Sequence, residues 1–154
     1  LPQLFAWFGN EHVFEWWPDE PNDWAKFQQH WQEKLQKPDV APFIVYFDAL
    51  PLGYIQYYTV TEQARSWLPP LPEHTVGIDQ FIGESNYIGK GYGALLIAAF
   101  IKFLKNEIPN VQAIIVDPNP TNTRAIKCYQ KVGFAKVGEY KSPWGLVLIM
   151  RFEC

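Results

Sequence analysis

The chain has 154 residues, of which 48% are hydrophobic and 17% aromatic, and its formal net charge is -3. This length suits a single domain, residues 1–154, with a sizeable core, and the charge disfavours a nucleic-acid binder and favours cationic ligands. No apolar run reaches the roughly 18 residues that a membrane span needs, so we expect no membrane association.

The first half of the chain predicts two helices and a β-hairpin. Apolar residues recur at helical spacing in 1–8 and again in 24–35, where they are Trp24, Phe27, Trp31 and Leu35. Between them, the prolines of "EHVFEWWPDEP" are expected to stop any helix. The segments 42–47 and 52–60 are rich in β-branched and aromatic residues and predict strands joined by the turn "DALP". A proline-rich loop follows at 62–74.

The second half alternates strands and helices. We expect strands at 75–83 and 111–117, a helix at 93–105 between them, and a further helix that ends at Gly133. Two final strands, 135–141 and 146–152, close the chain. This order predicts an α/β fold with a mixed sheet.

Three glycines, Gly89, Gly91 and Gly93, alternate in "NYIGKGYGALLIAAF" directly before the helix at 93–105. Glycines at a helix start expose main-chain N–H groups at the positive end of the helix dipole, where phosphate binds; the alternative is a plain tight turn. A triphosphate loop would need Ser or Thr after Lys90, and a dinucleotide fingerprint would need Gly in place of Leu96. Neither motif is present.

The loop "IGKGYG", followed by a helix, a strand and "NTRAIKCYQKVGF", resembles the GCN5-related N-acetyltransferases (GNAT). The second signature comprises Asn122, Ala125, Tyr129, Gly133 and Phe134. The segments "HVFEWW", "GYIQYY", "GIDQFIG" and "VDPNPTNTRAIKCYQKVGF" narrow the resemblance to the aminoglycoside 6′-N-acetyltransferases over nearly the whole chain. The family fold is a mixed, mostly antiparallel sheet flanked by helices.

The resemblance implies acetyl-CoA as cosubstrate, bound with its pyrophosphate on the main-chain amides of the glycine loop. The residues expected to contact the coenzyme lie on the preceding strand, in the loop and in the second signature; they are Phe81, Ile82, Ile88, Gly89, Lys90, Gly91, Tyr92, Gly93, Ala94, Asn122 and Ala125. Asn122 is also expected to cap its helix.

Amine acetylation needs a group that takes a proton from the ammonium and one that protonates the departing thiolate. Asp79, in "GID" before the loop, is the candidate for the first role, and by resemblance Tyr129 is the candidate for the second. Each has a structural alternative: Asp79 could bridge neighbouring strands, and Tyr129 could be a core aromatic. Asp117 follows a buried strand, where α/β proteins place ligands, or it could cap the next turn with Asn119.

Trp16, Trp17 and Trp67 are candidates for the walls of an acceptor site, because aromatic faces attract ammonium groups; the alternative for each is core packing. Glu15, Asp19 and Glu20 lie beside the first pair and form either a cation-binding rim or a solvated loop. His12, His30 and His74 are scattered and predict no metal site. Cys128 and Cys154 lack metal spacing and are expected to be reduced thiols in a cytoplasmic protein.

The sequence departs from the family pattern at three places. Ile88 stands where the family often has Arg or Gln, and Ala64 stands where several aminoglycoside enzymes have an Asp that helps to hold the drug; Glu62 is a nearby carboxylate. The chain is also expected to start inside the first helix of the family fold, so that the strand that precedes this helix in the family is trimmed, disordered or absent.

Three functions follow as hypotheses. The first is an acetyl-CoA-dependent aminoglycoside 6′-N-acetyltransferase, expected to act as a monomer or homodimer on a polycationic small molecule. The second is an acyltransferase acting on another amine, such as a hydroxylysine siderophore precursor or a polyamine. The third is a coenzyme-A-binding module without turnover, which Asp79 and Tyr129 argue against.

Overall fold

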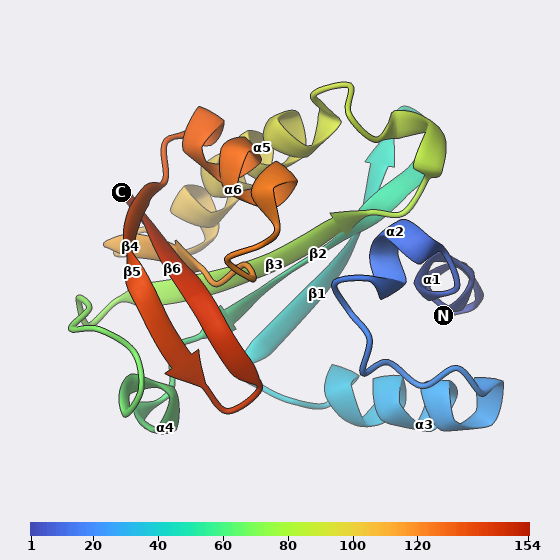
Figure 1. Cartoon of the computed structure of the whole chain (residues 1–154), viewed down its shortest axis with the longest axis horizontal. Helices are drawn as coiled ribbons and strands as arrows, with labels where there is room; N and C mark the ends of the chain where they lie inside the picture. Colours follow the sequence, from blue (N-terminus) through green and yellow to red (C-terminus); the bar gives the residue numbers. More distant parts are fainter. The chain divides into compact units, whose positions relative to one another are not determined.

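The computed structural model describes all of residues 1–154 and shows a six-stranded mixed sheet flanked by helices (Figure 1). The strand order is β1-β2-β3-β4-β6-β5. Strands β3 and β4 are parallel, whereas β6 runs antiparallel to both β4 and β5. The elements in chain order are α1 (Pro2–Phe8), α2 (Glu11–Phe14), α3 (Trp24–Leu35), β1 (Val40–Phe47), β2 (Leu50–Thr59), α4 (Glu62–Arg65), β3 (Thr75–Ile82), η1 (Ser85–Tyr87), α5 (Tyr92–Glu107), β4 (Ala113–Val116), α6 (Thr123–Val132), β5 (Ala135–Ser142) and β6 (Gly145–Glu153).

The chain forms two compact units. The first comprises Leu1–Tyr57 and Asp79–Tyr92, and the second comprises Tyr58–Ile78 and Gly93–Cys154. The glycine loop up to Tyr92 and the candidate Asp79 therefore belong to the first unit, and the signature from Asn122 to Phe134 belongs to the second.

The first unit has an aromatic core. Helices α1 and α3 contribute aromatic side chains at i, i+1 and i, i+4 spacing, and strands β2 and β3 contribute one ring each. The buried rings are Trp7, Phe8, Phe27, Trp31, Tyr54 and Phe81. Three pairs of these rings meet edge to face, namely Trp7–Phe81, Phe8–Phe81 and Trp31–Tyr54. This geometry is favoured for aromatic rings and adds to the stabilisation from burial.

Helices α1 and α2 are tied to the segment 82–84, which leads from β3 toward the glycine loop. The Trp7 indole lies so close to Gly83 that a Cβ there would come within 2.2 Å of the ring. Three hydrogen bonds join the same segments. Trp7 Nε1 donates to Glu84 Oε1 at 2.9 Å, and Asn10 Nδ2 donates to the Gly83 carbonyl at 3.1 Å. His12 Nε2 donates to the Ile82 carbonyl at 2.9 Å. The N-terminal helices therefore support the approach to the loop.

The second unit is built around β4, in which every residue is buried. Helix α5 buries a row of apolar side chains at helical spacing, namely Leu96, Ile97, Phe100, Ile101 and Leu104. Helix α6 begins at Asn122, whose side chain accepts from the Ala125 N–H at 3.2 Å, and ends at Gly133 with φ +124. Both predicted ends of this helix are confirmed.

The predicted long helices and the strands are confirmed, with shifted ends. The segment after Gly9 forms the short helix α2, which was not predicted, and this helix ends ahead of Pro18, as expected from the prolines that stop any helix there. Strand β1 begins at Val40 and so contains Pro42, which an edge strand tolerates. The short helices α4 and η1 were not predicted. No helix combines the length and the apolar character needed to span a bilayer.

Candidate functional site

The glycine loop has the backbone conformation that only glycine adopts readily. Gly89 and Gly91 have φ values of +73 and +84, and a Cβ placed on either would meet no atom within 4 Å. Helix α5 begins at Tyr92, immediately after the loop. Positive φ angles, open space and a helix N-terminus together fit a phosphate ligand approaching the main chain.

The start of the loop is fixed by η1. The Ile88 N–H donates to the Ser85 carbonyl at 3.3 Å, so this amide is already used within the turn. Aromatic rings flank the loop, with Tyr92 edge to face against both Tyr87 and Phe47 at centroid distances of 5.0 and 5.2 Å. Phe47 and Tyr87 also line an open hollow of about 440 Å³ at the β1–β2 turn.

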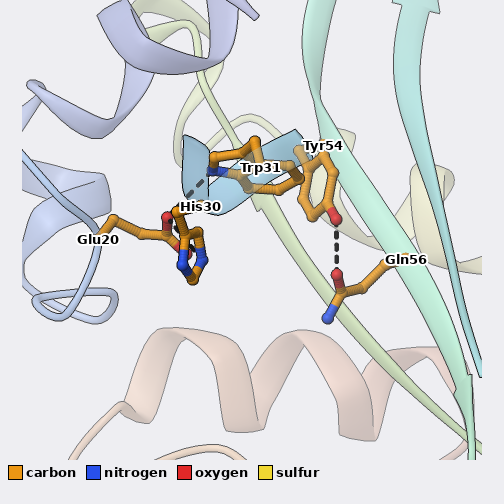
Figure 2. Close-up of polar contacts among 5 residues, drawn as sticks. All are labelled: Glu20, His30, Trp31, Tyr54 and Gln56. Atoms are coloured by element: carbon orange, nitrogen blue, oxygen red, sulfur yellow. Dashed lines mark hydrogen bonds and ion pairs between the residues drawn. The ribbon is translucent and has the colours of Figure 1, made fainter. Parts of the chain in front are cut away.

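Asp79 is held by a chain of hydrogen bonds that runs from a buried tyrosine. The Tyr54 hydroxyl donates to Gln56 Oε1 at 2.6 Å, and Gln56 Nε2 donates to Asp79 Oδ2 at 2.8 Å. Figure 2 shows the first of these bonds. Burial, followed by the charges of Asp79 and Glu20, raises the pKa of Tyr54, so its hydroxyl stays a proton donor. The network leaves Asp79 half-buried and oriented by a donor from β2.

The predicted alternation along β3 agrees with these contacts. Tyr54 and Gln56 are two residues apart on β2, and their partners Phe81 and Asp79 are two residues apart on β3. Phe81 stacks on Tyr54 at 5.6 Å, so its side chain is part of the core and only its main chain is left for a coenzyme. The bond from Gln56 also shows that Asp79 bridges strands, which was the structural alternative, and this role is compatible with catalysis.

Of the acids near the tryptophan pair, only Glu20 reaches the aromatic core. Its Oε2 accepts from Trp31 Nε1 at 3.1 Å and lies 3.7 Å from His30 Nε2 (Figure 2). The side chain of Glu20 is 11% exposed, whereas Glu15 and Asp19 are exposed to solvent. The exposure of Glu15 and Asp19 fits the cation-binding rim as well as the solvated loop, whereas Glu20 is anchored by a side chain of α3.

The tryptophan candidates differ in their surroundings. Trp16 is exposed, while Trp17 packs edge to face on Phe81 and Tyr54 at 5.5 and 6.3 Å. In the second unit, Trp67 packs edge to face on Trp144 at 5.7 Å. Trp17 is thus partly a core residue, which was its structural alternative.

The second unit places its candidates around α6. Tyr129 is buried and packs edge to face on Phe134 at 5.4 Å, so its ring has the core position that was its structural alternative. Asp117 follows β4 as predicted and is half-buried. The turn after it is closed by Asn119, whose Oδ1 accepts from the N–H and the hydroxyl of Thr121 at 3.0 and 2.8 Å.

Cys128 is a free thiol in α6, close to Gly93, where a Cβ would lie 3.2 Å from its sulfur. Burial raises the pKa of Cys128, which disfavours the thiolate and a nucleophilic role. Cys154 is also free.

Three residues near Asp79 were not identified as site candidates from the sequence: Gln56, Tyr54 and Lys34. The alternation in "GYIQYY" is a signal for the first two, because residues 54 and 56 share one face of a strand. Lys34 lies in α3 three residues after Trp31, and its ammonium is 4.3 Å from the centre of that indole. A lysine at this spacing in an amphipathic helix gives no sequence signal, since most such lysines face solvent.

Comparison with known proteins agrees with this geometry. A family model described as an acetyltransferase (GNAT) domain matches residues 1–142. The aminoglycoside N(6')-acetyltransferase type 1 of Klebsiella pneumoniae is 34% identical over 154 residues, covering 97% of this chain and 76% of that protein. A crystal structure of aminoglycoside acetyltransferase AAC(6')-Ib with coenzyme A and kanamycin is similar, with a TM-score of 0.87 and 31% identity, covering 99% of this chain and 88% of that one.

A more distant relative is the lysine N-acyltransferase MbtK of Mycobacterium sp. (strain MCS), 22% identical over 139 residues, which cover 89% of this chain and 56% of that protein. The family match and the structural similarity confirm the resemblance carried by the glycine loop and the signature from Asn122 to Phe134. The chain belongs to the GNAT acetyltransferase family and has its fold.

Proposed function

We propose that this protein transfers an acetyl group from acetyl-CoA to a primary amine, the 6′-amine of an aminoglycoside. The observation that carries the proposal is the position of Asp79. It is oriented by Gln56 on the strand that continues through 82–84 into the glycine loop, within one compact unit. Support also comes from the Klebsiella relative named for this activity and from the similar structure with coenzyme A and kanamycin.

The glycine loop is the part of the chain that fits the coenzyme. In the proposed complex, the main-chain amides of Gly89–Gly93 hold the pyrophosphate, with the α5 N-terminus favouring its negative charge. The Ile88 amide takes no part, because it is bonded to Ser85. The main chain at Phe81 and Ile82 precedes the loop and is proposed to lie along the pantetheine arm. Acetyl-CoA supplies the thioester that is cleaved.

Asp79 is the proposed base that deprotonates the acceptor amine. An aliphatic ammonium is mostly protonated near pH 7 and is not a nucleophile until it loses a proton. Asp79 accepts this proton, directly or through a water, and the neutral nitrogen attacks the thioester carbonyl. A C–N bond forms as the C–S bond breaks, in one ternary complex and without an acyl-enzyme.

The second unit supplies the proposed acid. Tyr129 gives its phenolic proton to the departing thiolate and is reprotonated from solvent, which also takes up the second proton that the attacking nitrogen loses as the amide forms. Asn122 and Ala125, at the start of α6, are proposed to contact the coenzyme, and the capping bond to Ala125 leaves the second lone pair and the NH₂ group of Asn122 for this role.

The acceptor is proposed to be polycationic. Several ammonium groups on one rigid ligand need several carboxylates, since charge-assisted hydrogen bonds are the stronger kind. We assign this role to Asp79 and Asp117, with Trp16, Trp17 and Trp67 as aromatic walls.

The test is a thiol-release assay with acetyl-CoA and a panel of kanamycin, hydroxylysine and spermidine under one condition. The proposal expects kanamycin to turn over best and Asp79→Asn to lower kcat/KM by at least about 10²-fold, because a charge and a proton acceptor are lost together. Asp48→Asn is the matched control, since it removes the same charge from an exposed turn position. Equal losses in the two variants would show that Asp79 has no special role.

A second acceptor class is favoured by two observations. One relative is named a lysine N-acyltransferase, and Ala64 stands in α4 where the resemblance expects a drug-binding Asp, with Glu62 exposed in the first turn of the same helix. Turnover of hydroxylysine without turnover of kanamycin would replace the aminoglycoside assignment with this one.

A further inference from the structure

A lysine of the chain itself occupies an aromatic cage in the first unit. The ammonium of Lys34 lies 4.3 Å from the centre of the Trp31 ring, 5.9 Å from that of Trp17 and 6.0 Å from that of Tyr54. The Tyr54 ring is nearly perpendicular to both indoles, at 89° to Trp17 and 88° to Trp31. Three aromatic walls around one nitrogen are the arrangement that proteins use to bind ammonium ligands.

Two carboxylates act on the caged ammonium, Glu20 from the loop before α3 and Asp79 from β3. Glu20 is anchored by the Trp31 indole, and Asp79 is anchored by Gln56, whose other bond comes from Tyr54. Tyr54 therefore belongs to both groups: it is a wall of the cage and the first residue of the hydrogen-bond chain that ends at Asp79. Lys34 is partly buried, and this burial lowers the pKa of its ammonium. The negative charges of Glu20 and Asp79 act in the opposite direction and favour the charged form.

Lys34 places its ammonium over a buried ring. Because Lys34 comes three residues after Trp31 in α3, the two side chains share one face of the helix, and Trp31 is 0% exposed. Without the lysine, the cage would combine aromatic faces with the nearby carboxylates of Glu20 and Asp79, a combination that attracts an ammonium group. With the lysine, one positive charge is already there.

We propose that Lys34 is a specificity-determining residue, whose ammonium fills from within the chain the aromatic cage beside Asp79 that would otherwise take a second ammonium group of the acceptor. The inference rests on the proposed role of Asp79 in binding the acceptor amine. It names the acceptor class more narrowly: the group that faces the cage is a hydroxyl or another hydrogen-bond acceptor, and acceptors with an ammonium group at that position bind less well.

The test measures binding by calorimetry without acetyl-CoA, using kanamycin as a probe with several ammonium groups and 6-amino-6-deoxyglucose as a probe with one. The variants are Lys34→Met, which keeps the length and removes the charge, and Lys34→Arg, which keeps the charge. Lys26→Met is the matched control, because it removes an exposed charge from the same helix. Lys34→Gln is the second neutral variant in case Lys34→Met does not fold.

We expect the neutral variants to bind kanamycin about tenfold more tightly than the wild type does, which is the size of one added charge-assisted contact. Their increase in affinity for the single-amine probe should be at least about threefold smaller than that for kanamycin. Lys34→Arg and Lys26→Met should both stay within about twofold of the wild type. The gain for kanamycin should shrink as salt is raised, since partly exposed charges are screened.

An equal gain for both probes, no gain for kanamycin, or the same gain in Lys26→Met would overturn the inference. Thiol release on the same proteins separates the two proposals. A selective gain in binding without any acetylation would leave the inference standing and refute the proposed function, whereas acetylation with unchanged selectivity would do the reverse.

Discussion

The hydrogen-bond chain from Tyr54 through Gln56 to Asp79 gives a sharp prediction for Gln56→Leu. Gln56 is 6% exposed, and its amide accepts from one neighbour and donates to the other. Leucine has a similar volume but neither group. The Tyr54 hydroxyl, on a residue 1% exposed, then loses its acceptor, and Asp79 loses a donor.

The expected cost follows from these two losses. An orphaned buried hydroxyl costs about 1–3 kcal/mol, and a lost hydrogen bond to a charged group costs about 1.5–3 kcal/mol. Because Asp79 is only half-buried, water replaces part of the second loss. We therefore expect the free energy of unfolding to fall by roughly 2–4 kcal/mol.

A double-mutant cycle with Tyr54→Phe isolates the first loss. In the Tyr54→Phe background no hydroxyl is left to be orphaned, so Gln56→Leu should cost about 1–2 kcal/mol less than it does in the wild type. Urea unfolding of the four proteins measures this coupling, and Tyr46→Phe, at a residue 62% exposed, is the control for removal of a hydroxyl. Costs that add to within about 0.5 kcal/mol would refute the structural link between the two residues.

Three further predictions concern the loop, the acid and pH. Gly91→Val should lower coenzyme affinity in calorimetry by at least about tenfold, whereas Gly145→Val, at a turn with φ +128, should carry a similar backbone strain and keep the affinity; equal affinities would remove the loop from the site. Tyr129→Phe should keep coenzyme affinity and lower turnover about 10²-fold, and wild-type turnover would leave Tyr129 as a core aromatic alone. Burial raises the pKa of Tyr54, so above about pH 10 the unfolded chain loses a proton that the folded chain retains. From pH 10 to 11, the free energy of unfolding of the wild type should therefore fall by up to about 1.4 kcal/mol more than that of Tyr54→Phe. Urea unfolding at several pH values measures this difference, and an identical pH dependence of the two proteins would contradict it.

Periodicity was sufficient to predict the regular elements. The row of apolar residues in α5 repeats at helical spacing from Leu96 to Leu104, and the α6 boundaries carry a capping Asn122 and a terminal Gly133. These signals are local, because each depends on neighbours within one or two turns. The alternate glycines are also a local signal, and they predicted a loop with unusual backbone angles, which Gly89 and Gly91 have.

The contacts around Asp79 could not be predicted in the same way, because they join distant parts of the chain. Gln56 is an ordinary strand residue until β2 lies beside β3, and Glu20 is one of three acids in a loop until α3 presents the Trp31 indole to it. Periodicity also placed Leu35 in the buried row of α3, yet it is 52% exposed. At the last turn of a helix the apolar face is defined only to about one residue, and there Lys34 covers the core ring.

The three hydrogen bonds between α1–α2 and the segment 82–84 have a consequence for the order of folding during synthesis. They join residues separated by 70 to 77 positions, so they close a long loop and cannot form until the ribosome has released Glu84. Until then the Trp7 indole lacks the acceptor and the backbone on which it packs. The aromatic helices α1 and α2 are thus exposed for the time needed to make the 70 to 77 residues in between, and the loop that would bind the coenzyme acquires its support only when they dock.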